Sequence, residues 1–416
     1  MRDRDLYATI LGLSDPWHVI DVDLKIAEEE VRVHVAAKSG TRFACPACNE
    51  MCPKHDHRRR EWRHLDTCQF RTILVADVPR VRCEQHGVHQ VDVPWAEPGS
   101  RFTALFEAIV IDWLREASIL GVARRMKLTW DEVAGIQARA VARGLARREL
   151  GSPEYLGVDE TSFRKRHDYV TVVTDLVTGD VLDVTDGRRK ASLDEFFVKL
   201  TSDQLSAIEA VAMDMHKPYI ASTKEYVPAA DEKICFDRFH VSKHLGDALD
   251  RVRSDEHREL RARGNPLLTG TKHIWLQRHE TLDGCKREVL DVLRGSALRT
   301  ARAWAMKEFA ITLWRYVRPS WALRGWHRLI SWLRRSRLEP MKRVGAMLRD
   351  HLWGIINAVV KGVTNAGSES VNARIQRVKK LACGFRNRRR FRDAILFHLG
   401  GLELYPIGVA ATHTDS

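Results

Sequence analysis

The chain has 416 residues, which is long for one hydrophobic core and predicts two to four domains. Lysine and arginine number 68 against 55 aspartates and glutamates, and this net charge of +13 predicts a polyanionic partner such as nucleic acid. Apolar runs stay shorter than the roughly 20 residues that span a bilayer, and the N-terminus lacks a signal-peptide core, so we expect a soluble intracellular protein with metal-binding cysteines.

Residues 1–98 are expected to form a β-rich domain that binds zinc. The stretch WHVIDVDLKIAEEEVRVHVAA alternates apolar and polar residues, as half-buried strands do. Cys45 and Cys48 form a CxxC pair, and Cys83 and His86 form a CxxH pair that completes a tetrahedral Cys3His zinc site. The substitute ligands are Cys52, His55, Cys68 and His89. The alternative interpretation is a set of buried thiols beside a surface histidine.

Residues 99–150 are expected to form a helix-turn-helix DNA-binding domain. Two helical patterns are followed by the turn KLT, after which Thr129 can cap a helix and Glu132 completes a capping box. In this layout the second helix, at about Trp130–Ala142, enters the major groove. The candidate phosphate contacts, or alternatively a solvated helix face, are Arg124, Arg125, Lys127, Arg139 and Arg143.

Residues 151–240 are expected to form the first part of an α/β catalytic domain. Strands are predicted at Tyr155–Val158, His167–Leu176 and Val181–Val184, followed by a helical stretch and by buried strands in AIEAVAMDM and KICFDRFHV. Three antiparallel strands, a helix and further parallel strands are the element order of the ribonuclease H fold. In that fold the ends of the first and fourth strands lie side by side.

The first and fourth of these strands are followed by Asp159 and Asp214. Two carboxylates at one point repel each other unless they are protonated or bind a cation. Two magnesium ions about 3.5–4 Å apart would neutralise both and are the usual means of in-line attack at phosphate. The sequence therefore predicts metal-dependent phosphoryl transfer, against the alternative that each aspartate caps a strand or turn.

Residues 241–360 are helical in pattern throughout and predict an all-α insertion. The catalytic domain resumes at 361–405, and 406–416 is a C-terminal tail. Seven of the twelve tryptophans lie in the insertion: Trp275, Trp304, Trp314, Trp321, Trp326, Trp332 and Trp353. Most are expected in the core. The alternative for one of them is stacking on an unpaired base, and Trp321 is the least buried candidate.

Several motifs resemble those of the bacterial ISL3-family insertion-sequence transposases: GVDETS, AMDM, DRFHVSKHL and TNAGSESVNARIQRVKKLACGFRNRRRFRDAIL. The resemblance covers nearly the whole chain and implies a DDE transposase with the catalytic triad Asp159, Asp214 and Glu369. It places Asp237 and His240 of the DRFH motif beside the catalytic centre. It also implies Mg²⁺ (or Mn²⁺) as the working ion and terminal inverted repeats of DNA as the substrate.

Two positions depart from the family pattern. The second cysteine pair is replaced by Cys83 and His86, and the glycine that usually follows the third acid is Ser370. Neither departure removes needed chemistry, because histidine ligates zinc and serine is small.

The surroundings of Glu369 suit a third metal ligand. VTNAGSES contains a helix-entry signal, and Glu369, Asn372 and Gln376 then fall on one stripe of the helix. The rival acids are Glu308, Glu339 and Asp350, and the alternative role of Glu369 is a first-turn acid favourable to the helix dipole. Nine basic residues and no acid lie between Arg374 and Arg392, and the expected phosphate contacts among them are Arg374, Arg377, Lys379, Lys380, Arg386 and Arg388.

The expected protein is therefore a multidomain α+β DNA transposase. It would bind double-stranded DNA at transposon ends and target, act as a homo-oligomer, and lie with the nucleoid in a bacterial cytoplasm. The alternatives are a DNA-binding regulator with an inactive ribonuclease H-like domain and a structure-specific nuclease. A strand-transfer assay separates the three.

Overall fold

The computed structural model describes residues 3–164 and 168–409, and its contacts divide the chain into two compact units. Unit 1 comprises residues 1–148 together with 402–416, and unit 2 comprises residues 149–401. The contacts therefore assign residues 402–405 to unit 1, whereas the sequence analysis had assigned them to the catalytic domain. His167 of the expected second strand and residues 410–416 of the expected tail lie outside the described residues.

The first part of unit 1 is a β-rich domain built on a five-stranded sheet in the order β1-β2-β6-β5, with β7 paired to β6. Its elements are α1 (Asp3–Ile10), β1 (Trp17–Lys25), η1 (Ile26–Glu28), β2 (Glu30–Ala37), β3 (Phe43–Ala44), β4 (Met51–Cys52), β5 (Lys54–Thr67), β6 (Phe70–Cys83) and β7 (Gly87–Gln90). Trp95 packs edge-on against Trp17 and Trp62, with ring centroids 4.9 and 5.4 Å away. These indoles pack in the core of this domain with the alternating valines of β2 and with Leu74, Ala76, Val78 and Val81 of β6.

The second part of unit 1 is helical: α2 (Ala104–Glu116), α3 (Ile119–Met126) and α4 (Trp130–Arg147). The turn between α3 and α4 uses Lys127, which adopts a left-handed conformation with φ 53°. Thr129 caps α4, and the predicted capping box with Glu132 is confirmed. The helix-turn-helix layout expected from the sequence is therefore present, although α4 continues five residues beyond the expected end.

Unit 2 contains a second five-stranded sheet, in the order β10-β9-β8-β11-β12. Its strands are β8 (Tyr155–Arg164), β9 (Asp168–Asp175), β10 (Val181–Asp186), β11 (Ala210–Met213) and β12 (Ile234–Phe236). The first three are antiparallel, and β11 and β12 run parallel to β8. The helices between these strands are α5 (Lys190–Phe197), α6 (Ser202–Ala207), α7 (Lys217–Tyr226) and α8 (Ala230–Lys233).

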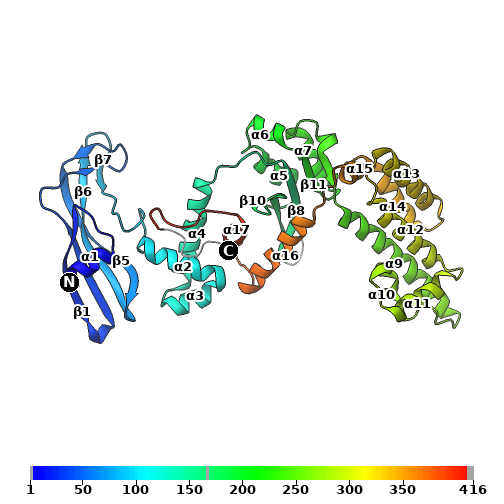
Figure 1. Ribbon diagram of the computed structural model, residues 1–416, viewed down its shortest axis with the longest axis horizontal. Helices are drawn as coiled ribbons and strands as arrows, with labels where there is room; N and C mark the ends of the chain where they lie inside the picture. Colours follow the sequence, from blue (N-terminus) through cyan, green and yellow to red (C-terminus); the bar gives the residue numbers. More distant parts are fainter. Residues whose placement is uncertain (1–2, 165–167, 410–416) are drawn as a thin grey trace. The chain divides into compact units, whose positions relative to one another are not determined.

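The described residues between β12 and α16 are helical, without a strand. They form α9 (Arg238–Ala262), α10 (Lys272–Leu276), η2 (His279–Thr281), α11 (Gly284–Arg294), α12 (Arg299–Leu313), α13 (Pro319–Arg335), α14 (Glu339–Asp350) and α15 (Leu352–Lys361). Figure 1 shows them as a group beside the sheet of unit 2, with α15 leading back towards it. One hydrophobic core continues from the sheet into this group, so the two parts of unit 2 support each other.

The last two helices return to the sheet. They are α16 (Ala366–Leu381) and α17 (Arg388–Leu399), which pack against β8 and β10 respectively. Among the described residues, no helix has both the length and the apolar character that crossing a bilayer requires.

Candidate functional site

Three aspartates lie at one level across three neighbouring strands of unit 2. Ala212 of β11 pairs with Gly157 of β8, so Asp214 and Asp159 each lie two residues beyond a paired position. Met213 pairs with Phe236 of β12, so Asp214 and Asp237 each follow a paired position. Because the strands are parallel, their carboxyl ends meet at the same edge of the sheet. Asp159, Asp214 and Asp237 are therefore gathered at that edge.

The expectation that the first strand ends at Val158, with Asp159 after it, was wrong. β8 continues to Arg164, and Asp159 itself pairs with Val172 of β9. Only the parallel ladder with β11 stops early, after Gly157. Asp159 thus lies within a strand that is held on one side and open on the other.

His240 lies between two of these carboxylates, one turn into α9. Its Nδ1 is 3.3 Å from Asp214 Oδ2, and its Nε2 is 4.0 Å from Asp237 Oδ2. Asp237 is the N-cap of α9 and is only 4% exposed. Burial raises the pKa of Asp237, and the backbone N–H groups of Phe239 and Asn365 together with His240 partly oppose this.

A line of hydrogen bonds fixes α16 along β8. Asn372 Nδ2 donates to Asp159 Oδ2 at 2.7 Å, Gln376 Nε2 to Thr161 Oγ1 at 3.1 Å, and Lys379 Nζ to the carbonyl of Ser162 at 2.8 Å. These donors are spaced four and three residues apart, so they lie on one face of the helix. The sequence pattern predicts Asn372 and Gln376 on one stripe, but neither the addition of Lys379 nor the partners on β8. The contacts define both the position and the rotation of α16.

Glu369 lies one turn before Asn372 on α16, and its side chain is exposed. Partial burial raises the pKa of Glu369, the charge of Asp237 adds to this effect, and His240 opposes it. The charges of Asp237 and His240 therefore act on the Glu369 carboxyl. In the described residues, these acids form no group of three with atoms as close together as those of the cysteine cluster described below.

The start of α16 approaches β8 very closely at Gly157. A Cβ at that position would lie 2.1 Å from Ser368 Oγ and 2.9 Å from Asn365 Oδ1, so only glycine fits. Ser368 and Asn365 are themselves buried, and their side-chain polar atoms have no hydrogen-bond partner among the described residues. Asn372 Oδ1 and Asp237 Oδ2 are also buried and have no hydrogen-bond partner among the described residues. The run NAGSES thus supplies buried polar atoms from Asn365 and Ser368, and Asn372 adds another one turn later. The sequence pattern does not predict this role for the three residues.

Asp159 is the most perturbed of the acids. Burial raises its pKa to about 6, Glu160 and Asp237 add to the effect, and the backbone N–H of Glu160 and the nearby His240 oppose it. A carboxyl group with a raised pKa, whose ionised form is destabilised in the free protein, is typical of a functional site. A bound divalent cation would reverse this preference, because it stabilises the ionised form.

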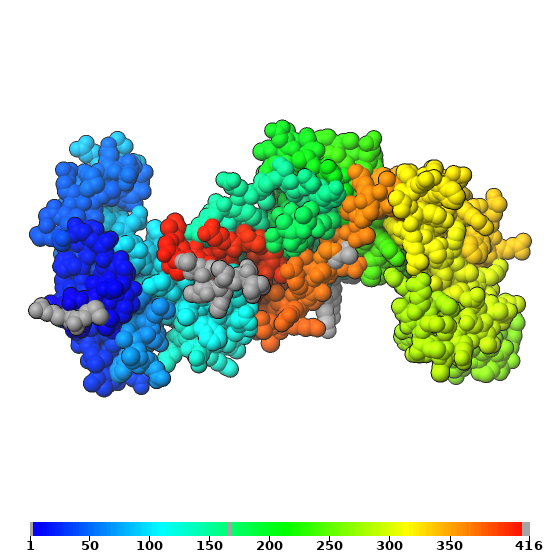
Figure 2. All heavy atoms as spheres, viewed as in Figure 1, coloured from blue at the N-terminus to red at the C-terminus, as the bar shows by residue number. Residues whose placement is uncertain are grey.

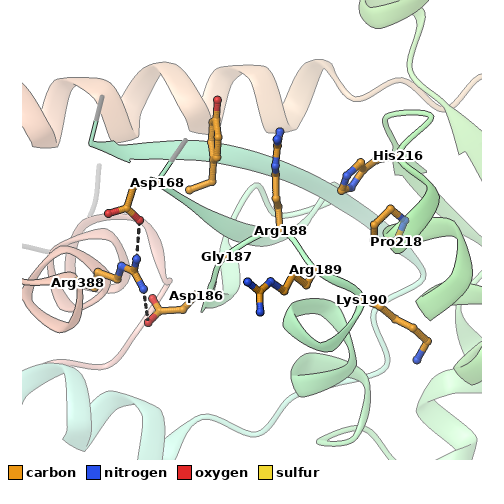
Figure 3. A pocket seen from close by; sticks show the side chains of 10 residues that line it. Asp168, Asp186, Gly187, Arg188, Arg189, Lys190, His216, Pro218 and Arg388 are labelled. Carbon is orange, nitrogen blue, oxygen red and sulfur yellow. Dashed lines mark hydrogen bonds and ion pairs between the residues drawn. The ribbon is translucent and has the colours of Figure 1, made fainter. Parts of the chain in front are cut away.

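Unit 2 also contains a pocket of about 690 Å³ (Figure 3). It is lined by Asp168, Tyr169, Asp186, Gly187, Arg188, Arg189, Lys190, His216, Pro218 and Arg388. Arg188 reaches Glu160 at 3.3 Å, Arg388 pairs with Asp168 and Asp186, and Lys190 pairs with Asp194 and Glu225. Figure 3 shows Arg189 between Asp186 and Lys190. Because acids neutralise most of its cations, the pocket alone is not an anion site.

Unit 1 contains a metal-ligand cluster of Cys45, Cys48, Cys83 and His86, whose ligand atoms all lie within 4.8 Å of one another. The Cys48 and Cys83 sulfurs are 3.7 Å apart, and Cys83 Sγ is 3.5 Å from His86 Nδ1. Tetrahedral zinc with usual bond lengths requires about 3.8 and 3.6 Å for these two separations. A hydrogen bond with His86 lowers the pKa of Cys83 to about 6, which favours the thiolate that zinc binds. The four predicted ligands therefore fit a structural zinc ion.

The arginines of α4 are used inside unit 1. Arg139 pairs with Glu107 at 2.5 Å, and Arg143 pairs with Glu97 and Glu107 at 2.5 and 2.9 Å. Arg143 is 7% exposed and also donates to the carbonyl of Leu404. The structure therefore does not support the expected phosphate contact for Arg143, and Glu107 already neutralises Arg139.

The other predicted cations of unit 1 lie at the surface. Arg124 and Arg125 are exposed in the last turn of α3, with Arg125 over the ring of Trp113. Lys127 is exposed in the turn and lies 3.6 Å from Glu29. The basic surface of the helix-turn-helix is therefore provided by α3 and the turn.

The predicted cations of α16 and α17 divide in the same way. Arg377, Lys380 and Arg386 are exposed. Arg374 donates to the carbonyl of Gly179 at 2.9 Å, Lys379 to that of Ser162, and Arg388 to Asp168 at 2.7 Å. The first group is available to a partner, and the second group holds the helices to the sheet.

Comparison with protein-family models gives three matches along the chain. Residues 156–395 match the ISL3-type DDE model described as a transposase. Residues 41–86 match the zinc finger of the transposases IS204, IS1001, IS1096 and IS1165, and residues 91–141 match the helix-turn-helix domain of the ISL3 transposase family.

Curated relatives agree with these models. The chain is 26% identical to the transposase for insertion sequence element IS1001 of Bordetella parapertussis, over 83% of this chain and 86% of that protein. It is 28% identical to the transposase for insertion sequence element IS1557 of Mycobacterium tuberculosis, over 93% of each chain.

Proposed function

Because the chain belongs to the ISL3 family of transposases, a family of DNA-binding DDE enzymes, we propose that the carboxyl edge of the unit 2 sheet is its catalytic centre. Asp159, Asp214 and Glu369 are the proposed triad. The enzyme would bind the terminal inverted repeats of its element, cleave the DNA ends and join them to target DNA. The observation that carries this proposal is the alignment of Asp159, Asp214 and Asp237 across three strands, with Glu369 in the first turn of α16, a helix that packs against β8.

The strand order supports a ribonuclease H-like catalytic domain. Three antiparallel strands, with two parallel strands beside the first, form the order β10-β9-β8-β11-β12. Helices α9–α15 lie between β12 and α16, and we propose that they are an all-α insertion between two parts of the catalytic domain. In this proposal α16 returns to the sheet, packs against β8 and carries Glu369 in its first turn.

The donors present at the sheet edge suit two Mg²⁺ ions, which prefer oxygen ligands. Carboxylate oxygens are available from Asp159, Asp214 and Glu369, and the buried Asp237 Oδ2 has no hydrogen bond among the described residues. When bound, the metal pair would activate a water or 3′-hydroxyl group and stabilise the leaving oxygen. Asn372 would hold Asp159 Oδ2 in place, which leaves Oδ1 to the backbone N–H of Glu160 and to a ligand.

His240 is the proposed positioning group for Asp214. Its Nδ1 faces Asp214 Oδ2 and its Nε2 faces Asp237 Oδ2, so it separates two carboxylates that would otherwise repel each other. This arrangement gives the DRFH motif a physical role beside the metal ligands.

DNA would contact each unit through its exposed cations. Among them are Arg124, Arg125 and Lys127 in unit 1 and Arg377, Lys380 and Arg386 in unit 2. Zinc at Cys45, Cys48, Cys83 and His86 would stabilise the domain next to the helix-turn-helix. Joining two ends in one event requires two catalytic centres, so the working form would be a homo-oligomer on DNA.

The test is cleavage and strand transfer on an oligonucleotide that carries the element's own terminal repeat. Asp159→Asn, Asp214→Asn and Glu369→Gln should each lower both reactions by orders of magnitude and leave end binding unchanged. The matched control is Glu339→Gln, because Glu339 pairs with Lys342 on the surface of α14 and should keep normal activity.

Other outcomes have definite meanings. Normal activity of Glu369→Gln with an inactive Glu339→Gln would move the third acid elsewhere. A wild-type chain that hydrolyses DNA without joining ends would be a nuclease. A chain that binds ends without metal-dependent cleavage would be a regulator.

A further inference from the structure

Helix α13 has two different faces. Its buried face consists of Ala322, Trp326, Leu329, Ile330 and Leu333, which pack into the helical group. Its opposite face carries Trp321, Arg324, Arg328, Trp332 and Arg335, all of them exposed. These five residues, which we call the α13 stripe, are spaced by three or four positions and therefore form one continuous line along the helix. Figure 2 shows the yellow atoms of this part of the chain at the surface.

The stripe lies in a strongly basic segment. Between Glu308 and Glu339 the sequence has no aspartate or glutamate, and it has seven arginines: Arg315, Arg318, Arg324, Arg328, Arg334, Arg335 and Arg337. Arg315 pairs with Glu280, but within the described ranges the other six form no ion pair. The two flanking glutamates are already paired, with Lys307 and Lys342. The charge of this face is therefore uncompensated by the protein.

Aromatic rings alternate with these cations. Trp321 is 56% exposed and Trp332 is 40% exposed, which is unusual for the largest apolar side chain. The Arg324 guanidinium lies 5.6 Å from the Trp321 ring, and Arg328 lies 5.9 Å from Phe309, whose ring is 6.3 Å from Trp332. The two exposed indoles are separated by about 16 Å along the helix axis. That distance equals about five stacked nucleotides at 3.4 Å each.

The chemistry of this surface selects one kind of occupant. An apolar protein partner would cover the indoles but would bury several arginines without an acid, which is costly. Duplex DNA would satisfy the arginines but would leave the indoles without a ring to stack on. An unpaired DNA strand offers phosphates to the arginines and base faces to the tryptophans.

We propose that the α13 stripe binds an unpaired DNA strand, namely the strand that is freed when the duplex opens at a transposon end. This inference rests on the proposed function for the origin of that strand. The binding itself needs neither metal nor cleavage, so the two proposals can fail separately.

The experiment measures binding of the full-length chain in EDTA to three labelled probes that share one sequence: a blunt duplex, the same duplex with a five-nucleotide unpaired extension, and the single strand. Trp321→Ala and Trp332→Ala should each weaken binding of the extended duplex and the single strand about 5- to 100-fold, since one stacked base is lost. Blunt-duplex affinity should stay within about twofold. Trp321→Phe keeps a ring and should restore most of the lost affinity.

Two further variants test the contribution of charge and the independence of this surface from the catalytic centre. Arg328→Ala should weaken the same two probes and lower the slope of log affinity against log salt by about one. Asp159→Asn should leave all three affinities unchanged, which separates this surface from the catalytic centre. Equal losses on the blunt duplex would show a general duplex surface and would overturn the preference for an unpaired strand. Unchanged affinity of the tryptophan variants for every probe would overturn the proposal altogether.

Discussion

Asp159→Asn should stabilise unit 2 at pH 8 in the absence of divalent metal, although it should abolish activity. Burial raises the pKa of this carboxyl to about 6, against an ordinary value of 3.8. A folded-state pKa above the unfolded value means that stability is fully present below pH 3.8 and is lost as the pH rises through 6. At 1.36 kcal/mol per pKa unit, the cost of the charged form is about 3 kcal/mol at pH 8 and about half of that at pH 5.

Asparagine removes this charge and can keep both hydrogen bonds. Its Oδ1 can accept from the backbone N–H of Glu160, as Asp159 Oδ1 does at 2.7 Å. Its amide can donate to Asn372 Oδ1, which is buried without a partner among the described residues, once the Asn372 amide turns over. The variant therefore loses little packing, and most of the electrostatic gain should be visible.

The assay is denaturant unfolding of the full-length chain in EDTA at pH 8 and pH 5, with hydrogen exchange of β8 amides to identify unit 2. The variant should be more stable by up to about 3 kcal/mol at pH 8 and by about half as much at pH 5. Magnesium should reverse the order, because it stabilises only the chain that binds it. The control Asp350→Asn is exposed and should change stability by less than about 0.5 kcal/mol. A variant less stable than the parent at pH 8, or a gain that is equal at both pH values, would refute the reasoning.

Cys45→Ser should reduce zinc from one ion per chain to none by elemental analysis, and full zinc in the variant would exclude this cysteine as a ligand. Glu107→Gln should lower the free energy of unfolding of unit 1 by about 3 kcal/mol in a denaturant titration, because Arg139 and Arg143 lose a buried counter-charge. A loss below about 0.5 kcal/mol would show that this ion-pair network contributes little to stability. Gly157→Ala should abolish cleavage and keep DNA binding, because its Cβ would meet Ser368 Oγ at 2.1 Å. The helical control Gly246→Ala has open space around it and should retain activity.

Features with a fixed local spacing could be predicted from the sequence. The zinc cluster follows from two short pairs of ligands, each held in its own turn, and the structure brings all four together. The capping box of α4 likewise depends on two residues three positions apart. Asp159 and Asp214 could be predicted to lie at the same edge of the sheet, because each follows an apolar run that must lie inside it.

Features that depend on distant partners could not be predicted in this way. The polar residues after Asp159 belong to β8 because β9 pairs with them, and their composition alone indicates a loop. Arg139 and Arg143 have the sequence spacing of a DNA-contacting face, but their partners come from segments 32–46 residues earlier and, for Arg143, from Leu404. The position of Asn372 on one stripe of a helix could be predicted. Its hydrogen bond to Asp159 could not, because the two residues are 213 positions apart in the sequence.

The attachment of residues 402–405 to α4 has a consequence for synthesis of the protein. Arg143 and Arg147 donate to the carbonyls of Leu404 and Tyr405, and Leu402 lies against Gly144. The ribosome makes α4 before it makes the 149–401 segment, which takes roughly 10–50 s at 5–20 residues per second. Unit 1 therefore cannot reach its final packing on the nascent chain until residues 402–405 have been translated. A product that terminates within 149–401 would leave the α4 surface that residues 402–405 cover exposed to solvent.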